Sequence, residues 1–368
     1  RKCLDSAQIN MDEFLKEQRK NNLQDEEIVL TLLSHKKFQM NPVKEVRSES
    51  EWLTRIHNAM ANNRPIEIVY PQFCCIPNAP KRYTNIGPVA GEDCTIEFFK
   101  LINQYVKKIY PPGLVFHILS DASLYASAFQ TPYTEVKIYY ERLCERVDVL
   151  GAADIIKLYD YEELLRTKCY PDYVQFYYSI GHSVWTEDLT NLLPPETVDT
   201  LRRSIRTSVN TRRFQLTHND HLQLFGPPSL RAPTHKFFKL IENLTDIALR
   251  EFITIRIACE NVNISDRLWP NAIRATCHRG PKHGRWAIGL RPYPEYLHSS
   301  KLLPYHGMPL ITYDKNKKKL KLEIVPEVML RGRTDLVRII LPTSGVKIDN
   351  ESNEVYAYIA ADTNADMK

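Results

Sequence analysis

Four side chains that can transfer protons or bind anions lie close together near the end of the chain. They are His298, Lys301, Tyr305 and His306, in the stretch HSSKLLPYHGMPLI. Histidine titrates near neutral pH and can act as an acid or a base, and a lysine ammonium can hold an anion. The same residue types also occur in solvated loops, and for His298 we expect ordinary loop solvation.

A second pair, Arg274 and His278, lies in the segment AIRATCH, which predicts a β-strand. Two side chains that are four residues apart on a strand point to the same face. An arginine fork can bind a carboxylate or phosphate bidentately, and a neighbouring histidine can move a proton. The alternative is a surface face of a sheet that carries polar side chains without a ligand.

The elements that must position these residues alternate between strands and helices from residue 66 onward. The β-rich runs IEIVYP, GLVFHIL and DIIKLYD are separated by the helical patterns CTIEFFKLINQYVKKIY and PYTEVKIYYERLCERV. We expect Asp93 or Thr95 to cap the first of these helices. The alternation predicts an α/β fold with a Rossmann-like parallel sheet and right-handed crossovers.

Ligands of such sheets bind beyond the carboxyl ends of the strands. Ser120 and Asp121 follow the strand GLVFHIL, and a long loop rich in Pro, Asn and Gly follows the strand IEIVYP. That loop contains Asn78, Lys81 and Arg82, and loops of this length in compact domains are usually functional or disordered. The ligand edge is therefore expected at these residues.

The pattern along the chain predicts three parts. Residues 1–62 read as helices with charged faces, residues 63–232 as the Rossmann-like domain, and residues 233–368 as an α+β region that completes the site. A basic helix is expected over residues 195–213, and a long amphipathic helix over residues 235–259. One side of the long helix is predicted to carry Phe237, Leu240, Leu244, Ile247 and Phe252.

Composition narrows the class of protein. The 368 residues are 43% hydrophobic and 25% charged, with a net charge of +5, which is ordinary globular composition. Cations are spread among acidic residues, so nucleic acid is not predicted as a partner, whereas a small anionic substrate suits the modest excess. None of the eight cysteines forms a CxxC pair. No apolar run is long enough to span a membrane. The first residues, RKCLDSAQIN, lack the apolar core of a signal peptide. We expect a cytoplasmic protein with reduced thiols.

The common catalytic motifs are absent. The chain has no GxGxxG, GxxxxGK[ST], GxSxG or HExxH segment, which argues against the commonest nucleotide, serine-hydrolase and zinc-protease sites. His218 and His221 are three residues apart, but no further ligand has convincing spacing. No metal site is therefore predicted.

Five segments in a fixed order carry a more specific signal. They are IPNAPKRYTNIG…GED, YPPGLVFHILSDASLYA, WPNAIRATCH, RWAIGL and LPYHGMPLI. Their order and spacing, from about Ile66 to Ile324, resemble the isocyanide (isonitrile) synthase family of the pyoverdine/dityrosine biosynthesis type. Asn78, Asp121, Arg274, His278 and His306 match the family pattern.

Three positions depart from that pattern, so the chain resembles a divergent member. Ser120-Asp121-Ala122-Ser123 stands where the family has Ser-Asp-Gly-Arg, and Tyr305-His306-Gly307 stands where it has Trp-His-Gly. A lysine that the family carries shortly before Pro-Asn is replaced near Cys75-Ile76.

The resemblance implies a reaction without a metal or organic cofactor. Family members join the amino nitrogen of tyrosine or tryptophan to a carbon of ribulose 5-phosphate and so form an isonitrile. Under that implication His278 and His306 transfer protons, and Asp121 orients one of them or holds the substrate ammonium. The expected substrate-binding residues are Asn78, Lys81, Arg82, Ser120, Arg274, Lys301 and Tyr305.

Two other functions stay open at this point. One is a formyl-tyrosine or dityrosine type of enzyme, or another transferase on the same scaffold, with a different amine or sugar phosphate. The other is a relative that binds its ligand without catalysis. The sequence leaves the amino acid, the oligomeric state and the downstream pathway undetermined.

Overall fold

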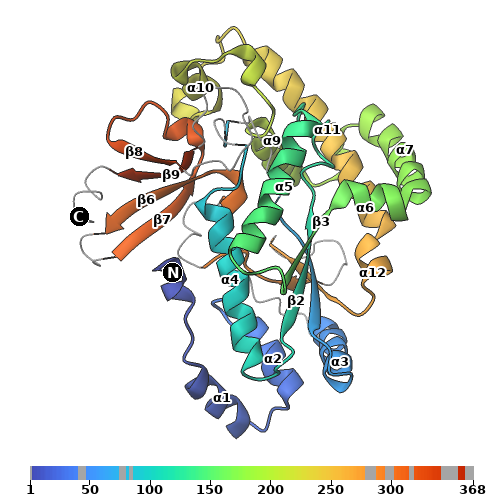
Figure 1. Ribbon diagram of the computed structural model, residues 1–368. Coiled ribbons are helices and arrows are strands. Elements are labelled where there is room, and N and C mark those ends of the chain that lie inside the picture. The colour runs from blue at the N-terminus through green and yellow to red at the C-terminus, as the bar shows by residue number, and fades with distance from the viewer. Residues whose placement is uncertain are drawn as a thin grey trace.

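Two β-sheets organise the chain, and helices surround the larger one (Figure 1). The computed structural model describes residues 2–39, 47–73, 80–82, 86–277, 287–294, 302–314, 319–340 and 355–360. The larger sheet has the strand order β3-β2-β1-β4-β5, and its five strands are parallel to their neighbours. They are β1 (Ile66–Pro71), β2 (Leu114–Ser120), β3 (Ile156–Asp160), β4 (Ile273–Thr276) and β5 (Ile288–Gly289).

The predicted α/β fold with a Rossmann-like parallel sheet is confirmed by this order. Strands β1 and β2 pair in parallel from Ile66↔Leu114 onward, and β2 and β3 pair from Phe116↔Ile156. Most residues of β1 and β2 are buried on both faces, as expected for a sheet that is covered on both sides.

Helices cover both faces of this sheet. The face that carries Ile68 and Ile118 packs against the N-terminal helices and α4, while Val69 and Leu119 on the opposite face pack towards the long helix α11. The helices before the crossover to β4 are η1 (Lys2–Ala7), α1 (Met11–Lys20), α2 (Asp25–Leu33), α3 (Arg47–Ala61), α4 (Ala90–Lys107), α5 (Tyr133–Val149), α6 (Tyr161–Lys168), α7 (Tyr170–Thr186), α8 (Leu189–Leu192) and α9 (Pro195–Arg206). The remaining ones before β4 are η2 (Arg212–Phe214), α10 (His218–Phe225), η3 (Pro228–Leu230), α11 (Phe238–Val262) and α12 (Ile264–Leu268).

A second sheet, beside the first, forms the C-terminal region (Figure 1). Its strand order is β7-β6-β9-β8, in which β6 is antiparallel to β7 and parallel to β9. The elements are η5 (Pro304–His306), β6 (Met308–Asp314), β7 (Lys319–Val325), η6 (Glu327–Met329), β8 (Leu336–Ile340) and β9 (Val355–Ala360). This sheet confirms the predicted β-containing C-terminal region.

Strands β4 and β5 come from the C-terminal third of the chain but belong to the parallel sheet. The division at residues 62/63 and 232/233 therefore separates pieces of sequence that share one sheet, and the three-part division stays a prediction.

Helix α4 begins earlier than its sequence suggests. Asp93 and Thr95 were expected as caps, but the helix starts at Ala90, and the Glu92 carboxylate accepts a hydrogen bond from the Val89 N–H at 3.1 Å. Asp93 is instead paired with Arg146. The cap prediction is wrong because the helix begins before Asp93, and the Glu92 carboxylate accepts the free backbone N–H at its start.

Two further helix predictions need correction. Helix α9 ends at Arg206 rather than at residue 213, because the following Thr, Ser and Asn residues favour turns, and the Asn210 side chain bonds to Gln130. In α11, Leu244 is buried as predicted, but Leu240 and Ile247 are 40% and 48% exposed. The buried stripe instead follows Ile241, Leu244, Ala248 and their successors, so the apolar face was assigned one residue out of phase.

Candidate active site at the carboxyl edge of the parallel sheet

The strand order reverses direction between β1 and β4. From β1 the chain proceeds outward to β2 and β3, and then crosses back to place β4 on the other side of β1. In open parallel sheets, the connections that leave two such strands diverge and leave a crevice beyond their carboxyl ends. The residues at these strand ends are therefore the candidate site.

One group of polar side chains lies on the α11 face of this edge. Asp121 and Tyr161 directly follow Ser120 and Asp160, which are register partners, so the two side chains belong to neighbouring strand ends on one face. Arg274 on β4 pairs with Val69, which packs on that same face.

Electrostatics link this group. Burial and the Cys259 thiol raise the pKa of the Tyr161 phenol well above its usual value, Asp121 raises it further, and Arg274 lowers it. Burial and Asp121 likewise raise the pKa of the Cys259 thiol, which shares a hydrogen bond with Tyr161. Both groups are therefore protonated at neutral pH and act as neutral hydrogen-bonding groups. The charges beside them are an aspartate and an arginine, and we name the four residues the Asp121–Arg274 group.

The Arg274 side chain is half-buried and has no hydrogen bond or ion pair within the described part of the chain. A half-buried guanidinium with five donors in a fixed fork is suited to a planar anion. It is close enough to the Tyr161 phenol to affect its pKa, as Asp121 also is. A positive and a negative group of this kind fit the two charged ends of a free amino acid.

A second group forms where η5 meets the ends of β1 and β4. The buried ring of Tyr305 lies 5.6 Å from the ring of Phe73, which follows β1, and its hydroxyl is 3.9 Å from the Sγ atom of Cys277, which follows β4. His306 is half-buried and meets the Tyr305 ring edge-on at 4.8 Å.

The two groups share one end of the sheet. The Ser120 hydroxyl donates a hydrogen bond of 3.4 Å to the carbonyl of Phe73, the residue against which Tyr305 packs. Ser120 precedes Asp121, and His306 follows Tyr305. The structure thus places these predicted residues at one end of the sheet, with Tyr305 packed on the Ile68 face and the Asp121–Arg274 group on the Val69 face, and their roles stay predictions.

Lys81 and Arg82 have partners within the fold. The Lys81 ammonium donates to the carbonyl of Ser204 at 3.0 Å and to the hydroxyl of Ser208 at 3.2 Å. These contacts lie in the last turn of α9 and just beyond it, where a cation complements the helix dipole. Arg82 forms a buried ion pair with Glu92. A phosphate-binding role for either residue therefore has less support than a structural one.

Three of the predicted residues, Asn78, His278 and Lys301, lie outside the described residues. The predicted pairing of Arg274 with His278 on one strand face therefore lies outside the described residues as well.

Sequence reasoning missed Tyr161 and Cys259. Tyr161 follows the strand DIIKLYD just as Asp121 follows Ser120, so the rule that was applied to β2 would have found it. Cys259 had no such signal, because it lies in the middle of a long helix pattern and reaches the site only through the packing of α11 on the sheet.

Among the described residues, no three or more His, Cys, Asp and Glu side chains are grouped closely enough to hold a metal ion. No described helix is both long and apolar enough to cross a membrane.

Comparison with known proteins supports the resemblance seen in the motifs. The family model described as pyoverdine/dityrosine biosynthesis protein matches residues 56–223, which include β1–β3, Asp121 and Tyr161, and this match confirms the resemblance. Among solved structures, the PvcA protein from Pseudomonas aeruginosa has the same fold, with a TM-score of 0.60 and 17% sequence identity. The match covers 92% of this chain and 100% of that chain. No curated protein matches the sequence.

Proposed function

We propose that this chain is a biosynthetic enzyme that condenses the amino group of an aromatic amino acid with ribulose 5-phosphate and forms an isonitrile. The observation that carries the proposal is the Asp121–Arg274 group, in which a guanidinium without a partner in the described residues lies near a carboxylate at the switch point of the sheet. The family match to pyoverdine/dityrosine biosynthesis supports the class of reaction.

The two charges suit the two ends of the amino acid. Arg274 would hold the α-carboxylate through its fork, and Asp121 would hold the ammonium until a histidine accepts its proton. The protonated Tyr161 and Cys259 add hydrogen-bonding groups without a further charge between them. This arrangement favours a zwitterion over a dianion.

The first step of the condensation needs acid and base groups in turn. The neutral amine attacks the ketone carbon of the sugar phosphate, which gives a carbinolamine, and loss of water then gives the imine. A base must accept the proton from nitrogen, and an acid must protonate the departing oxygen. We assign these transfers to His306 and His278, because imidazole can act in both directions near neutral pH.

Largely buried aromatic rings support the strand ends. Tyr305 and Phe73 form a ring pair there, and Tyr125 and Phe252 stack at 4.7 Å on the α11 side.

The test is a product assay with labelled sugar. The purified protein is incubated with tyrosine or tryptophan and uniformly ¹³C-labelled ribulose 5-phosphate, and the products are analysed by mass spectrometry. We expect an isonitrile that contains one labelled carbon. Arg274→Lys serves as the matched variant, since it keeps the charge but lacks the fork, and it should raise the KM for the amino acid. A labelled formyl product would indicate the alternative transferase, and unchanged amino acid would contradict the proposal.

A further inference from the structure

The positive charge of the chain is concentrated in one segment. Residues 202–239 contain eight Lys and Arg against a single acidic residue, Asp220, which gives a net +7. The other 330 residues contain 41 Lys and Arg and 43 Asp and Glu, so they are close to neutral with a net −2. The chain's net charge of +5 therefore comes from this segment, which we call the basic segment.

Three of its cations are neutralised within the fold. Arg202, Arg206 and Arg212 form ion pairs with Asp246, Glu242 and Glu135, respectively. The other five make no ion pair within the described residues, and four of them have exposed side chains. These five are Arg203, Arg213, Arg231, Lys236 and Lys239.

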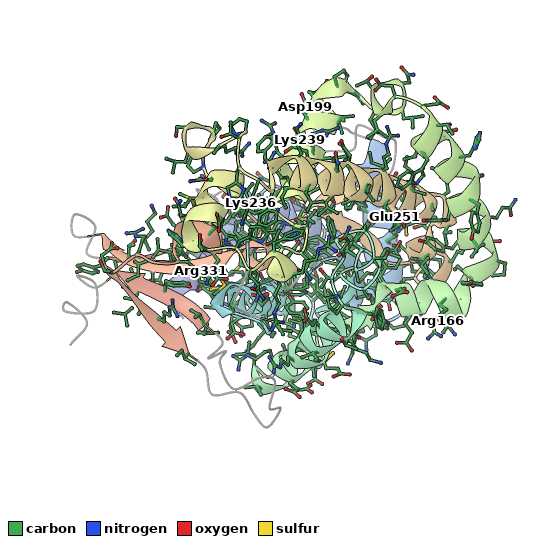
Figure 2. The ribbon with its side chains drawn as sticks, turned by 90° about the horizontal axis from the view of Figure 1, so that it is seen from above. Arg166, Asp199, Lys236, Lys239, Glu251 and Arg331 are labelled. Carbon is green, nitrogen blue, oxygen red and sulfur yellow. The ribbon has the colours of Figure 1, made fainter. Side chains whose placement is uncertain are left out.

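Aromatic contacts bring cations that are distant in sequence onto one surface. The rings of Phe214 and Phe237 stack at 5.4 Å. The Arg213 guanidinium lies 4.9 Å above the Phe214 ring, and the Lys236 ammonium lies 4.9 Å above the Phe237 ring. Lys236 and Lys239 are both seen on the face that Figure 2 views from above. Arg213 and Lys236, which are distant in sequence, therefore lie close together on the surface of the basic segment.

The part of the basic segment around the end of α9 contacts loops at the candidate site. Asn210 donates its backbone N–H to the carbonyl of Phe129 at 2.9 Å, and its side chain donates to Gln130 at 3.2 Å, in the loop after β2. Ser204 and Ser208 contact Lys81, in the loop after β1. In Figure 1, α9 and α10 lie above the end of the sheet at which these strands finish. The basic segment is thus fixed to the loops that surround the carboxyl edge.

We propose that the basic segment attracts the anionic sugar phosphate towards the site, and that Lys236 and Lys239 contribute to its capture at long range. The inference rests on the proposed function for the identity of the anion. Clustered charge of one sign next to a site raises the local concentration of oppositely charged substrate and its rate of association. Such an effect needs no direct contact, and it weakens as salt shortens the range of the field.

The experiment compares two double variants that remove the same charge from opposite ends of the sheet. Lys236→Gln/Lys239→Gln acts on the basic segment. Lys107→Gln/Lys108→Gln is the matched control, because these exposed lysines end α4 before the amino-terminal end of β2. For each, kcat and KM for ribulose 5-phosphate are measured at about 10 mM and about 150 mM ionic strength, where the Debye lengths are about 30 Å and 8 Å.

We expect Lys236→Gln/Lys239→Gln to lower kcat/KM about three- to tenfold at low ionic strength, with kcat unchanged. At the higher ionic strength the loss should shrink below about twofold, and the control should resemble the wild type at both. Equal salt dependence in the two double variants would overturn the inference.

Failure of the proposed function would look different. If the wild type forms no product, the binding of ribulose 5-phosphate is measured by calorimetry with the same proteins and the same two ionic strengths. Weaker, salt-dependent binding confined to Lys236→Gln/Lys239→Gln supports the inference, and equal binding by both variants overturns it.

Discussion

A Cβ atom placed on Gly91 would lie 2.6 Å from the carbonyl oxygen of Pro304. Helix α4 and the turn η5 therefore meet backbone to backbone, and only glycine allows that approach. Since η5 carries Tyr305 and His306, this contact fixes the height of both side chains above the strand ends. Gly91, which has no side chain, thus positions the side chains of Tyr305 and His306.

Gly91→Ala should push η5 away from α4 and misplace His306. We expect turnover to fall at least tenfold, because small displacements of catalytic groups are costly, and the melting temperature to fall by several degrees. Gly181→Ala is the matched control, since it also lies within a helix and its Cβ would make only an ordinary 3.5 Å contact with Thr254. The control should be neutral or slightly stabilising. Similar behaviour of the two variants would contradict the role of Gly91.

His306→Ala should lower turnover by about a hundred- to ten-thousand-fold, as expected for a general acid or base. The side chain is half-buried at the edge of a turn, so its loss should change the melting temperature little. Both quantities are measured on one preparation. An early-melting variant whose folded fraction turns over normally would assign His306 to packing instead of catalysis.

Arg274→Ala should weaken amino acid binding and lower the rate, with little effect on folding. The guanidinium forms no ion pair within the described part of the chain, so its removal breaks no described salt bridge. Isothermal titration with tyrosine and a thermal melt separate the two effects. A large loss of stability with unchanged binding would show that Arg274 is structural.

Arg82→Met should have the opposite profile. Arg82 and Glu92 are 1% and 0% exposed, and Tyr139 donates a second hydrogen bond to the Glu92 carboxylate at 3.0 Å. Loss of one partner of a buried ion pair typically costs about 3–5 kcal/mol, so the variant should unfold at much lower urea concentration. The double variant Arg82→Met/Glu92→Gln should recover part of that loss. If Arg82→Met unfolds like the wild type but binds ribulose 5-phosphate poorly, the phosphate-binding role would be favoured.

Stability should fall as the pH drops below the usual histidine pKa of 6.5, partly through His117. Burial lowers the pKa of His117, and its hydrogen bond to Glu67 opposes this only in part. The unfolded chain therefore takes up a proton that the folded chain resists, so this contribution to stability is present above pH 6.5 and is lost as the pH falls. His35 and His221 have lowered pKa values as well.

The measurement is the free energy of unfolding in urea at several pH values for the wild type and His117→Gln. The slope below pH 6.5 should be smaller in the variant, because the contribution of His117 is removed while those of His35 and His221 remain. An identical slope would show that His117 does not titrate differently in the two states.

Local patterns were enough to predict the strands that build the site. The apolar runs at residues 66–71 and 114–120 are flanked by turn residues, and their spacing leaves room only for helical crossovers, so the parallel sheet followed from the sequence. The position of Asp121 at the ligand edge followed from the same rule, because parallel strands finish at one edge.

Only the tertiary structure decided which polar residues are available to a ligand. Lys81 and Arg82 read as phosphate ligands in a loop, but Ser204 is brought to the first and the buried Glu92 to the second. Cys259 became part of the site because α11 packs on the sheet, although its sequence context is that of any helix. A local sequence pattern does not show which segments fold against a residue. It also does not show how far that residue is then removed from water.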